Sequence, residues 1–173
     1  DQVVCNGDDV NVNFESANSG GSTTFEWTND TPGIGLASSG SGDIPTFTAI
    51  NSGSSPIVAT VTVTPTFENE GVTCQGDSQT FTITVNPSSQ VDEVDNQVLC
   101  NGDDSDEINF TTSNTSGTTT YSWVNDTPSI GLAATGSGDI ASFTAVNNST
   151  PPVTATITAT PIYTNEGISC DGP

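Results

Sequence analysis

The residues of this chain that could carry chemistry are almost all carboxylates. Its 173 residues include 21 Asp and Glu but no Lys, Arg or His, which gives a formal net charge of -21. Without imidazole, amine or guanidinium groups, the usual constellations of hydrolases and transferases cannot be assembled. A carboxylate pair of the glycosidase kind is the remaining option, but most Asp residues lie in turn-like sequence where such side chains cap the backbone. We therefore predict no catalytic residue and no enzymatic activity.

The uniform negative charge also restricts the partners of this protein. Nothing in the sequence offers positive charge to a phosphate backbone or to an anionic membrane. No run of about 18 apolar residues could form a membrane-spanning helix. Disorder is a common consequence of such acidity, but alternating runs of Val, Ile, Thr and aromatic residues argue against it. We expect a folded protein that binds no nucleic acid and does not insert into membranes.

Two acidic clusters have the oxygen ligands that calcium prefers. One lies in the segment PSSQVDEVDNQ at 87–97, and the other lies in the CNGDD motif that begins at Cys100. No loop has the ligand spacing of an EF-hand. The alternative is that these carboxylates are solvated and keep the protein soluble, so that no cofactor is required. The candidate calcium ligands are Asp92, Glu93, Asp95, Asp103 and Asp104.

The same sequence unit occurs twice. CNGDD at Cys5 returns at Cys100, and WTNDTPGIGLASSGSGDI from Trp27 returns as WVNDTPSIGLAATGSGDI from Trp123. A unit of this length exceeds a solenoid repeat and has the size of an independent domain with its own core. We therefore interpret the chain as two domains of one kind, joined by a short and fairly stiff connector.

The two units differ by one insertion and one missing segment. The offset between them changes from 95 to 96 residues, which places an added residue between Asp104 and Asn109. We expect the domains at 1–91 and 92–173, and the second has no counterpart of the segment at 78–87. Either the sequence is a window cut from a longer array, or a neighbouring molecule donates the strand. Both interpretations make the chain part of a fibre.

Each unit is expected to be all-β. Residues alternate with period two in several runs rich in Val and Thr, and turn sequences such as GSGD and ENEG separate them. Short strands of this kind, with one Trp on a central strand, favour a two-sheet sandwich of immunoglobulin type. The expected strands of the first unit include 10–14, 23–29, 57–65 and 79–85.

The tryptophans and the residues that follow them are interpreted as structural. Trp27 and Trp123 are expected to fill the domain cores, with carbohydrate stacking as the alternative role. After the first Trp, the side chains of Asn29 and Asp30 are expected to close a turn. Further along, Ile34 and Leu36 should re-enter the core, and Asp43 and Asp139 should satisfy backbone donors in the glycine-rich turn.

Four cysteines are present, two in each unit. A duplicated unit that folds alone favours pairing within the unit. In such sandwiches the start of the first strand and the loop before the last strand lie at the same end of the domain. We therefore predict the disulfides Cys5–Cys74 and Cys100–Cys170. The absence of CxxC and of His argues against zinc, and disulfides indicate an oxidising, extracytoplasmic location.

Several unusual strings occur in a fixed order: CNGD, W-x-N-D-T-P-x-I-G-L-A-x-x-G-S-G-D-I, F-T-A-x-N, A-T-[VI]-T-[VA]-T-P, N-E-G-[VI]-[ST]-C and FTITVNP. Together they resemble the PKD-like repeats of very large Bacteroidetes surface proteins, among them gliding-motility adhesins that are cargo of type IX secretion. The resemblance covers nearly the whole chain. It implies tandem immunoglobulin-like sandwiches in long arrays on a bacterial cell surface, serving cell adhesion or filament structure without catalysis.

Two functions of different kinds follow from these observations. The favoured one is a structural repeat of a secreted bacterial adhesin or filament, a disulfide-locked acidic spacer whose partners are neighbouring repeats. The alternative is a module that binds a surface polysaccharide or a protein through its loops or sheet faces. Such a function should lie where the copies differ, in SANSGGST from Ser16 and TSNTSGTT from Thr112.

Overall fold

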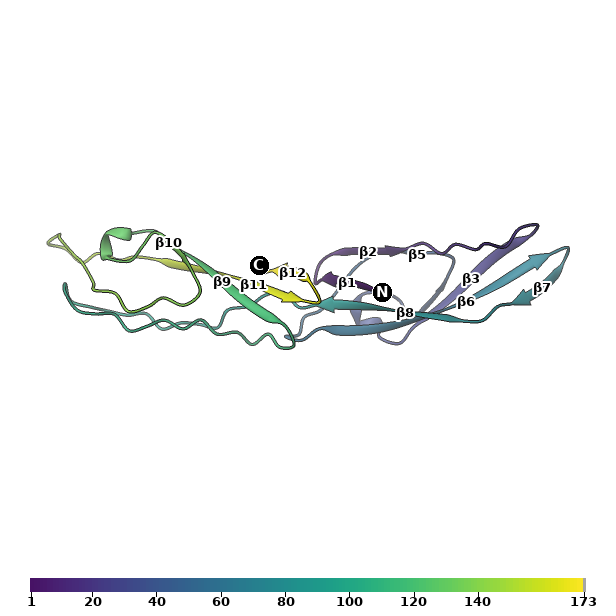
Figure 1. Ribbon diagram of the computed structural model, residues 1–173, viewed down its shortest axis with the longest axis horizontal. Helices are drawn as coiled ribbons and strands as arrows, with labels where there is room; N and C mark the ends of the chain where they lie inside the picture. The colour runs from purple at the N-terminus through teal and green to yellow at the C-terminus, as the bar shows by residue number, and fades with distance from the viewer. Residues whose placement is uncertain (173) are drawn as a thin grey trace. The chain divides into compact units, whose positions relative to one another are not determined.

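The computed structural model describes residues 1–172, which form β-strands joined by turns and loops (Figure 1). Two single-turn 3-10 helices, η1 (Pro32–Ile34) and η2 (Pro128–Ile130), are the helical elements of the described chain. None of its helices is long and apolar enough to cross a membrane. The strands are β1 (Gln2–Cys5), β2 (Asp9–Val12), β3 (Ser22–Asn29), β4 (Ser39–Ser41), β5 (Ile44–Thr48), β6 (Ile57–Asn69), β7 (Val72–Gln75), β8 (Gln79–Asn86), β9 (Thr118–Asn125), β10 (Thr135–Ser137), β11 (Ile157–Asn165) and β12 (Ile168–Asp171). The predicted fold class, all-β with immunoglobulin-like sandwich domains, is confirmed.

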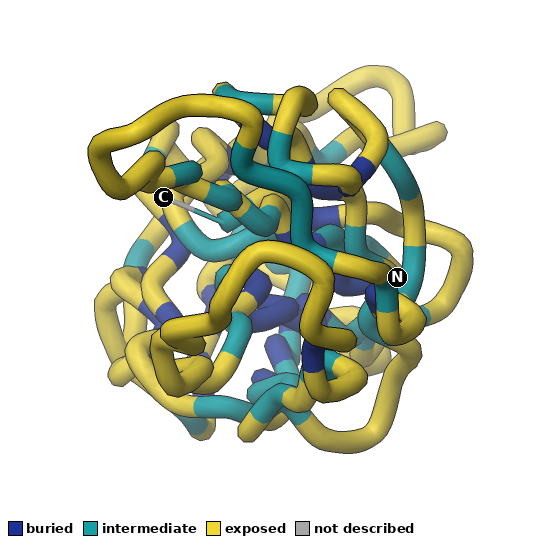
Figure 2. Tube along the Cα trace, turned by 90° about the vertical axis from the view of Figure 1, so that its left-hand side faces the viewer, coloured by how far each residue is buried: buried dark blue, intermediate teal, exposed yellow. Residues whose placement is uncertain are grey.

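The chain divides into two compact units. The first unit comprises Asp1–Ser88 with Glu166–Ile168, and the second comprises Ser89–Asn165 with the residues from Ser169 on. Buried positions gather in the interior, and the loops around them are exposed (Figure 2). Each unit has an apolar core of its own. That residues 1–91 and 92–173 fold as independent domains stays a prediction.

The first unit is organised around the long strand β6. Its large sheet has the order β1-β8-β6-β3-β4, with β7 also paired to β6, and β2 and β5 form a second, two-stranded sheet. Along β6, Ala59, Val61 and Val63 are buried, while the Thr residues between them are only partly buried. This alternation follows from the period of two along a strand, and Thr suits the wetter face. The four strands expected from the sequence are confirmed to within a few residues.

Residues after β3 close the core of the first unit. Ile34 and Leu36 are 0% and 3% exposed, as the sequence predicts. They pack with Val10 from the small sheet and with Ile83 from β8. The core therefore draws on both sheets and on the crossing segment between β3 and β4.

The second unit repeats this plan with fewer paired strands. Its sheet has the order β10-β9-β11-β12. The counterparts of β2 and β5 are reduced to the isolated bridges Asp104↔Thr144 and Ile108↔Ile140. The added residue lies between these bridges, where the first unit already has a register shift. Ile108 nevertheless packs against the core as its counterpart Val12 does. The extra residue is therefore absorbed locally, as in a bulge, and the ladder is interrupted here.

Strand β11 is shorter than its counterpart β6. In the first unit, residues 57–60 pair with β8 but not with β3, whose ladder with β6 ends at Val61. The corresponding residues 153–156 have no counterpart of β8 beside them within the described chain, and they are not part of a strand. Strand geometry at this edge therefore depends on a pairing partner.

Candidate functional site

An apolar groove lies in the second unit. It has a volume of about 860 Å³ and is lined by Ile108, Phe110 and Phe143, by residues 153–157, and by residues 91, 92 and 94–101. In the first unit, β8 occupies the corresponding position and pairs with β6 from Ile57↔Val85 to Val63↔Gln79. The groove is therefore bounded by an unpaired strand edge and by core side chains.

Burial of corresponding apolar residues differs between the two units. Ala59 and Val61 are fully buried in the first unit, whereas their counterparts Ala155 and Ile157 are only partly buried. Val98 corresponds to Val3 of β1, a strand that pairs in parallel with β8. Val98 is 97% exposed. In the first unit, β8 pairs with both of the strands that carry these positions, β1 and β6.

The cysteines do not pair as the sequence suggested. Cys5 and Cys170 are disulfide-bonded, whereas Cys74 and Cys100 carry free, exposed thiols. The predicted disulfides Cys5–Cys74 and Cys100–Cys170 are therefore wrong, and neither repeat is locked by a cystine of its own.

Strand register explains why pairing within a repeat fails. Cys5 lies opposite Asn86 at the end of β8, beyond the start of β6 at Ile57. Cys74 lies opposite Phe67, near the other end of β6. Ten positions of strand at about 3.3 Å each separate these ends by roughly 30 Å, and a disulfide requires Cα atoms within about 7 Å. The prediction failed because β1 runs parallel to β8, which carries Cys5 to the end of the domain opposite Cys74.

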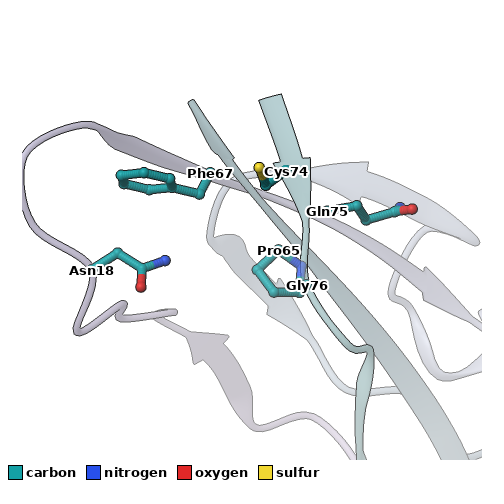
Figure 3. Close-up of a pocket in the computed structure, with 6 residues that line it drawn as sticks. All are labelled: Asn18, Pro65, Phe67, Cys74, Gln75 and Gly76. Carbon is teal, nitrogen blue, oxygen red and sulfur yellow. The ribbon is translucent and has the colours of Figure 1, made fainter. Parts of the chain in front are cut away.

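The free thiol of Cys74 lies in a small pocket at the tip of the first unit. The pocket has a volume of about 280 Å³. Figure 3 shows Phe67 and Cys74 on neighbouring strands, with Asn18 on the loop that faces them. Sequence reasoning did not single out this pocket, although most of its lining recurs in the second repeat. Its lining residues are Asn18, Pro65, Phe67, Cys74, Gln75 and Gly76.

The tryptophans belong to the cores, as expected. Trp27 and Trp123 are 4% and 7% exposed, which leaves no open indole face for the alternative role of stacking on a carbohydrate. Neither indole Nε1 has a hydrogen-bond partner within residues 1–172. Packing of the ring, rather than its polar atom, therefore accounts for the tryptophan at this position.

The predicted side-chain turn after β3 is confirmed in detail. Buried Asn29 donates from Nδ2 to the carbonyl oxygen of Leu36 at 3.0 Å, and its Oδ1 accepts from the amide of Thr31 at 3.0 Å. Asp30 Oδ1 accepts from the amide of Thr60 and from the hydroxyl of Thr31, both at 2.8 Å. The Thr60 amide, followed by the Thr31 hydroxyl, lowers the pKa of Asp30. Asn125 and Asp126 repeat these contacts in the second unit.

Asp43 and Asp139 accept backbone hydrogen bonds, but not within their own turn. Asp43 Oδ1 accepts from the amide of Phe14 at 2.8 Å, and Asp139 Oδ1 accepts from that of Phe110 at 2.8 Å. Each carboxylate therefore ties the glycine-rich turn to a segment 29 residues earlier in the chain. The expected hydrogen bonds within the turn are therefore wrong. The donor amides belong to Phe14, just after β2, and to its counterpart Phe110.

The candidate calcium ligands are not gathered into a site. No group of three or more metal-ligating side chains occurs within residues 1–172. Asp103 accepts from the Cys100 amide, Asp104 from the Thr144 hydroxyl and Asp92 from the Thr111 hydroxyl. These three carboxylates therefore have hydrogen-bond partners within the chain. Calcium binding that involves Asp92, Glu93, Asp95, Asp103 and Asp104 stays a prediction.

Comparison with known proteins identifies one family. A family model described as a PKD-like domain matches residues 2–89. This match covers the first repeat, from β1 to the end of β8, and the second repeat shares the motifs of the first. No curated protein and no solved structure gives a significant match to the chain.

Proposed function

The chain belongs to the PKD-like domain family, and from this premise we propose that it is a load-bearing structural segment of an extracellular bacterial adhesin or filament. PKD-like domains are structural, extracellular repeat modules, and the disulfide-bonded state of Cys5 and of Cys170 is compatible with an extracellular location. Neighbouring repeats are its partners. The proposed role is to provide reach and stiffness, and the negative charge discourages association between parallel chains.

The observation that carries this proposal is what the two repeats have in common. Both preserve the buried Trp, the Asn that closes the turn, and the Asp that accepts from the amide of Thr60 or Thr156. These residues hold a β-module together. The residues that the two repeats share are therefore those that maintain the fold, and a spacer requires only that the fold be maintained.

The mechanical role is testable by single-molecule pulling. The oxidised chain is reduced first, because disulfide-bonded cysteines limit extension. We expect two unfolding steps in the reduced chain, each of roughly 30 nm for a repeat of some 90 residues at about 3.5 Å per residue.

Glycan-array binding of the same oxidised chain distinguishes the spacer from a binding module. A spacer should give no signal above background. Saturable binding to a defined polysaccharide, lost on substitution of loop residues at 112–119, would replace the proposed function by the alternative one. A single unfolding step in the reduced chain would contradict the modular part of the proposal.

A further inference from the structure

The two repeats contain the same Asn-Gly pair within the same five residues. CNGDD begins at Cys5 and again at Cys100, and these are the two places in the sequence where Asn precedes Gly. An Asn side chain folds back readily onto its own backbone, and glycine has no side chain to obstruct the approach of its amide nitrogen. Asn6 and Asn101 are therefore the asparagines whose side-chain carbonyl the next amide attacks most readily, and their local sequences are equally reactive.

The fold of the first repeat holds Asn6 by both polar atoms of its side chain. Oδ1 accepts from the amide of Asn51 at 2.8 Å, and Nδ2 donates to Oγ of Ser88 at 3.1 Å. Asn51 is itself anchored, since it is only 2% exposed and its Nδ2 donates to the carbonyl oxygen of Val85 on β8 at 2.7 Å. An attack on the side chain of Asn6 therefore requires that the bonds to Asn51 and to Ser88 both break.

The side chain of Asn101 is held less firmly in the second repeat. Asn101 is exposed, and its Oδ1 accepts from the amide of Asn147 at 2.7 Å. Within residues 1–172, its Nδ2 has no counterpart of the bond to Ser88. Asn147 donates from its own Nδ2 to the carbonyl oxygen of Pro151 in the same loop, at 3.1 Å. One side-chain hydrogen bond, rather than two, therefore keeps the side chain of Asn101 away from the amide of Gly102.

The attacking nitrogen is restrained to the same degree in both repeats. The amide of Gly7 donates to the carbonyl oxygen of Ala49, and that of Gly102 donates to the carbonyl oxygen of Ala145, each at 2.8 Å. The φ angles of the two glycines are also alike, at 94° and 93°. The hydrogen bonds of the asparagine side chain are therefore what distinguishes the backbone geometry of the two sites.

We propose that Asn101 is a site of spontaneous deamidation in the folded protein, and that the bonds to Asn51 and Ser88 protect Asn6 from the same reaction. Local opening of residues 100–104 breaks fewer hydrogen bonds than the equivalent opening in the first repeat, so it occurs more often. The proposal concerns a covalent modification of the second repeat, and it does not depend on the proposed function.

The reaction needs only water as a co-reactant. The amide nitrogen of Gly102 attacks Cγ of Asn101 and loses its proton, the bond from Cγ to Nδ2 breaks, and ammonia leaves with that proton. The product is a five-membered succinimide ring. Water then adds to one of the two ring carbonyls and opens the ring, which gives aspartate, or isoaspartate where the main chain continues through Cγ. One water is consumed, one ammonia is released, and nothing is oxidised or reduced.

The modification loosens the contact between the CNGDD segment of the second repeat and residues 144–147. Isoaspartate adds a methylene group to the main chain between positions 101 and 102. This added length moves the amide of Gly102 away from the carbonyl oxygen of Ala145, and it removes the Oδ1 atom that accepts from the amide of Asn147 from its place. We therefore expect the amides of Gly102 and Asn147 to exchange with solvent faster in the modified chain.

The test is to incubate the full chain in mildly alkaline buffer and to quantify deamidation by mass spectrometry after digestion with chymotrypsin, since no Lys or Arg provides a trypsin site. We expect Asn101 to be modified about five- to tenfold faster than Asn6, the equivalent of one hydrogen bond. In concentrated urea the two asparagines should react at equal rates, because their pentapeptides are identical. Parallel samples with a reductant control for the disulfide-bonded state of Cys5, which Cys100 does not share, and they should show the same order of rates.

Two variants separate protection by the fold from other causes. Ser88→Ala removes the hydroxyl that accepts from Asn6, and it should raise the rate at Asn6 towards that at Asn101 while leaving Asn101 unchanged. Asn101→Gln keeps the amide but should abolish the modification at this position, because the larger ring that glutamine forms closes far more slowly. Equal rates at Asn6 and Asn101 in the folded chain, or an unchanged rate at Asn6 in Ser88→Ala, would overturn the proposal. Neither result bears on the pulling and glycan experiments, so failure of this inference and failure of the proposed function are distinguishable.

Discussion

The indole of Trp27 lies directly against the backbone of Gly40. A Cβ built on Gly40 would lie 2.2 Å from Cζ2 of Trp27, and the same construction at Gly136 falls 2.1 Å from Cζ2 of Trp123. Both glycines are on the short strand that pairs with the Trp strand, β4 or β10. The GSG element repeated in the sequence is therefore a platform for the core tryptophan.

Gly40→Ala is expected to destabilise the first unit by about 1–3 kcal/mol, because a methyl group cannot enter without displacing the ring. Gly136→Ala should do the same in the second unit. The control is Gly33→Ala, at a glycine with open space around it and no positive φ. Differential scanning calorimetry of the full chain measures each change. Equal stabilities for Gly40→Ala and Gly33→Ala would contradict the platform.

Asn29→Ala is expected to cost about 1–3 kcal/mol, because the buried carbonyl of Leu36 and the amide of Thr31 lose their partner. Asn125→Ala should have a similar effect on the second unit. Asn11→Ala, at an exposed position on β2, serves as the control and should change stability little. Urea denaturation monitored by tryptophan fluorescence reports both sites, since each lies two residues after a core Trp. The argument fails if the buried and the exposed substitutions cost the same.

The lowered pKa values of Asp30 and Asp126 predict that these carboxylates stabilise the fold near neutral pH and cease to do so in acid. Backbone hydrogen bonds from Thr60 and Thr156 are the largest cause in each case. A folded-state pKa below the unfolded value, here 3.8, stabilises the fold above that value, and the stabilisation is lost as pH falls through the folded pKa.

The measurement is the difference in melting temperature between the unsubstituted chain and Asp30→Asn, followed from about pH 6 down to about pH 2. The difference should be largest at the upper end and shrink towards zero at the lower end. Taking a difference separates this local effect from the general relief of repulsion as the many carboxylates become protonated. Asp77→Asn, at an exposed residue, should show no such trend. A difference in melting temperature that grows as the pH falls would contradict the prediction.

The groove of the second unit is expected to accept a strand with the sequence of β8. A peptide of residues 78–87, SQTFTITVNP, should raise the melting temperature of the second unit, by the equivalent of about 2.7 kcal/mol at a hundredfold excess over its Kd. It should also protect the backbone amides of 153–156 from hydrogen exchange, because these residues would regain a ladder partner. A control peptide with Ser in place of Phe81, Ile83 and Val85 keeps the backbone but removes the apolar face. Identical effects of both peptides would mean that the groove does not recognise a core-facing strand.

The sequence by itself determined the elements, because their signals are local. Alternation of Val and Thr follows from the two-residue period of a strand, so β3, β6 and β8 were predictable. The turn at Asn29 was predictable because its hydrogen bonds reach only a few residues along the chain. The motif order also sufficed to recognise the family, since the duplicated strings are those that build the module.

Only the tertiary structure decided how distant segments meet. The separation of Cys5 from Cys74 depends on β1 running parallel to β8, and no local pattern records that direction. The hydrogen bonds of residues 89 and 90 to Pro161 and Asn114 likewise join segments far apart in sequence. Sequence spacing describes neighbours along the chain, whereas disulfides and pockets depend on register between strands, which is set when the whole core packs.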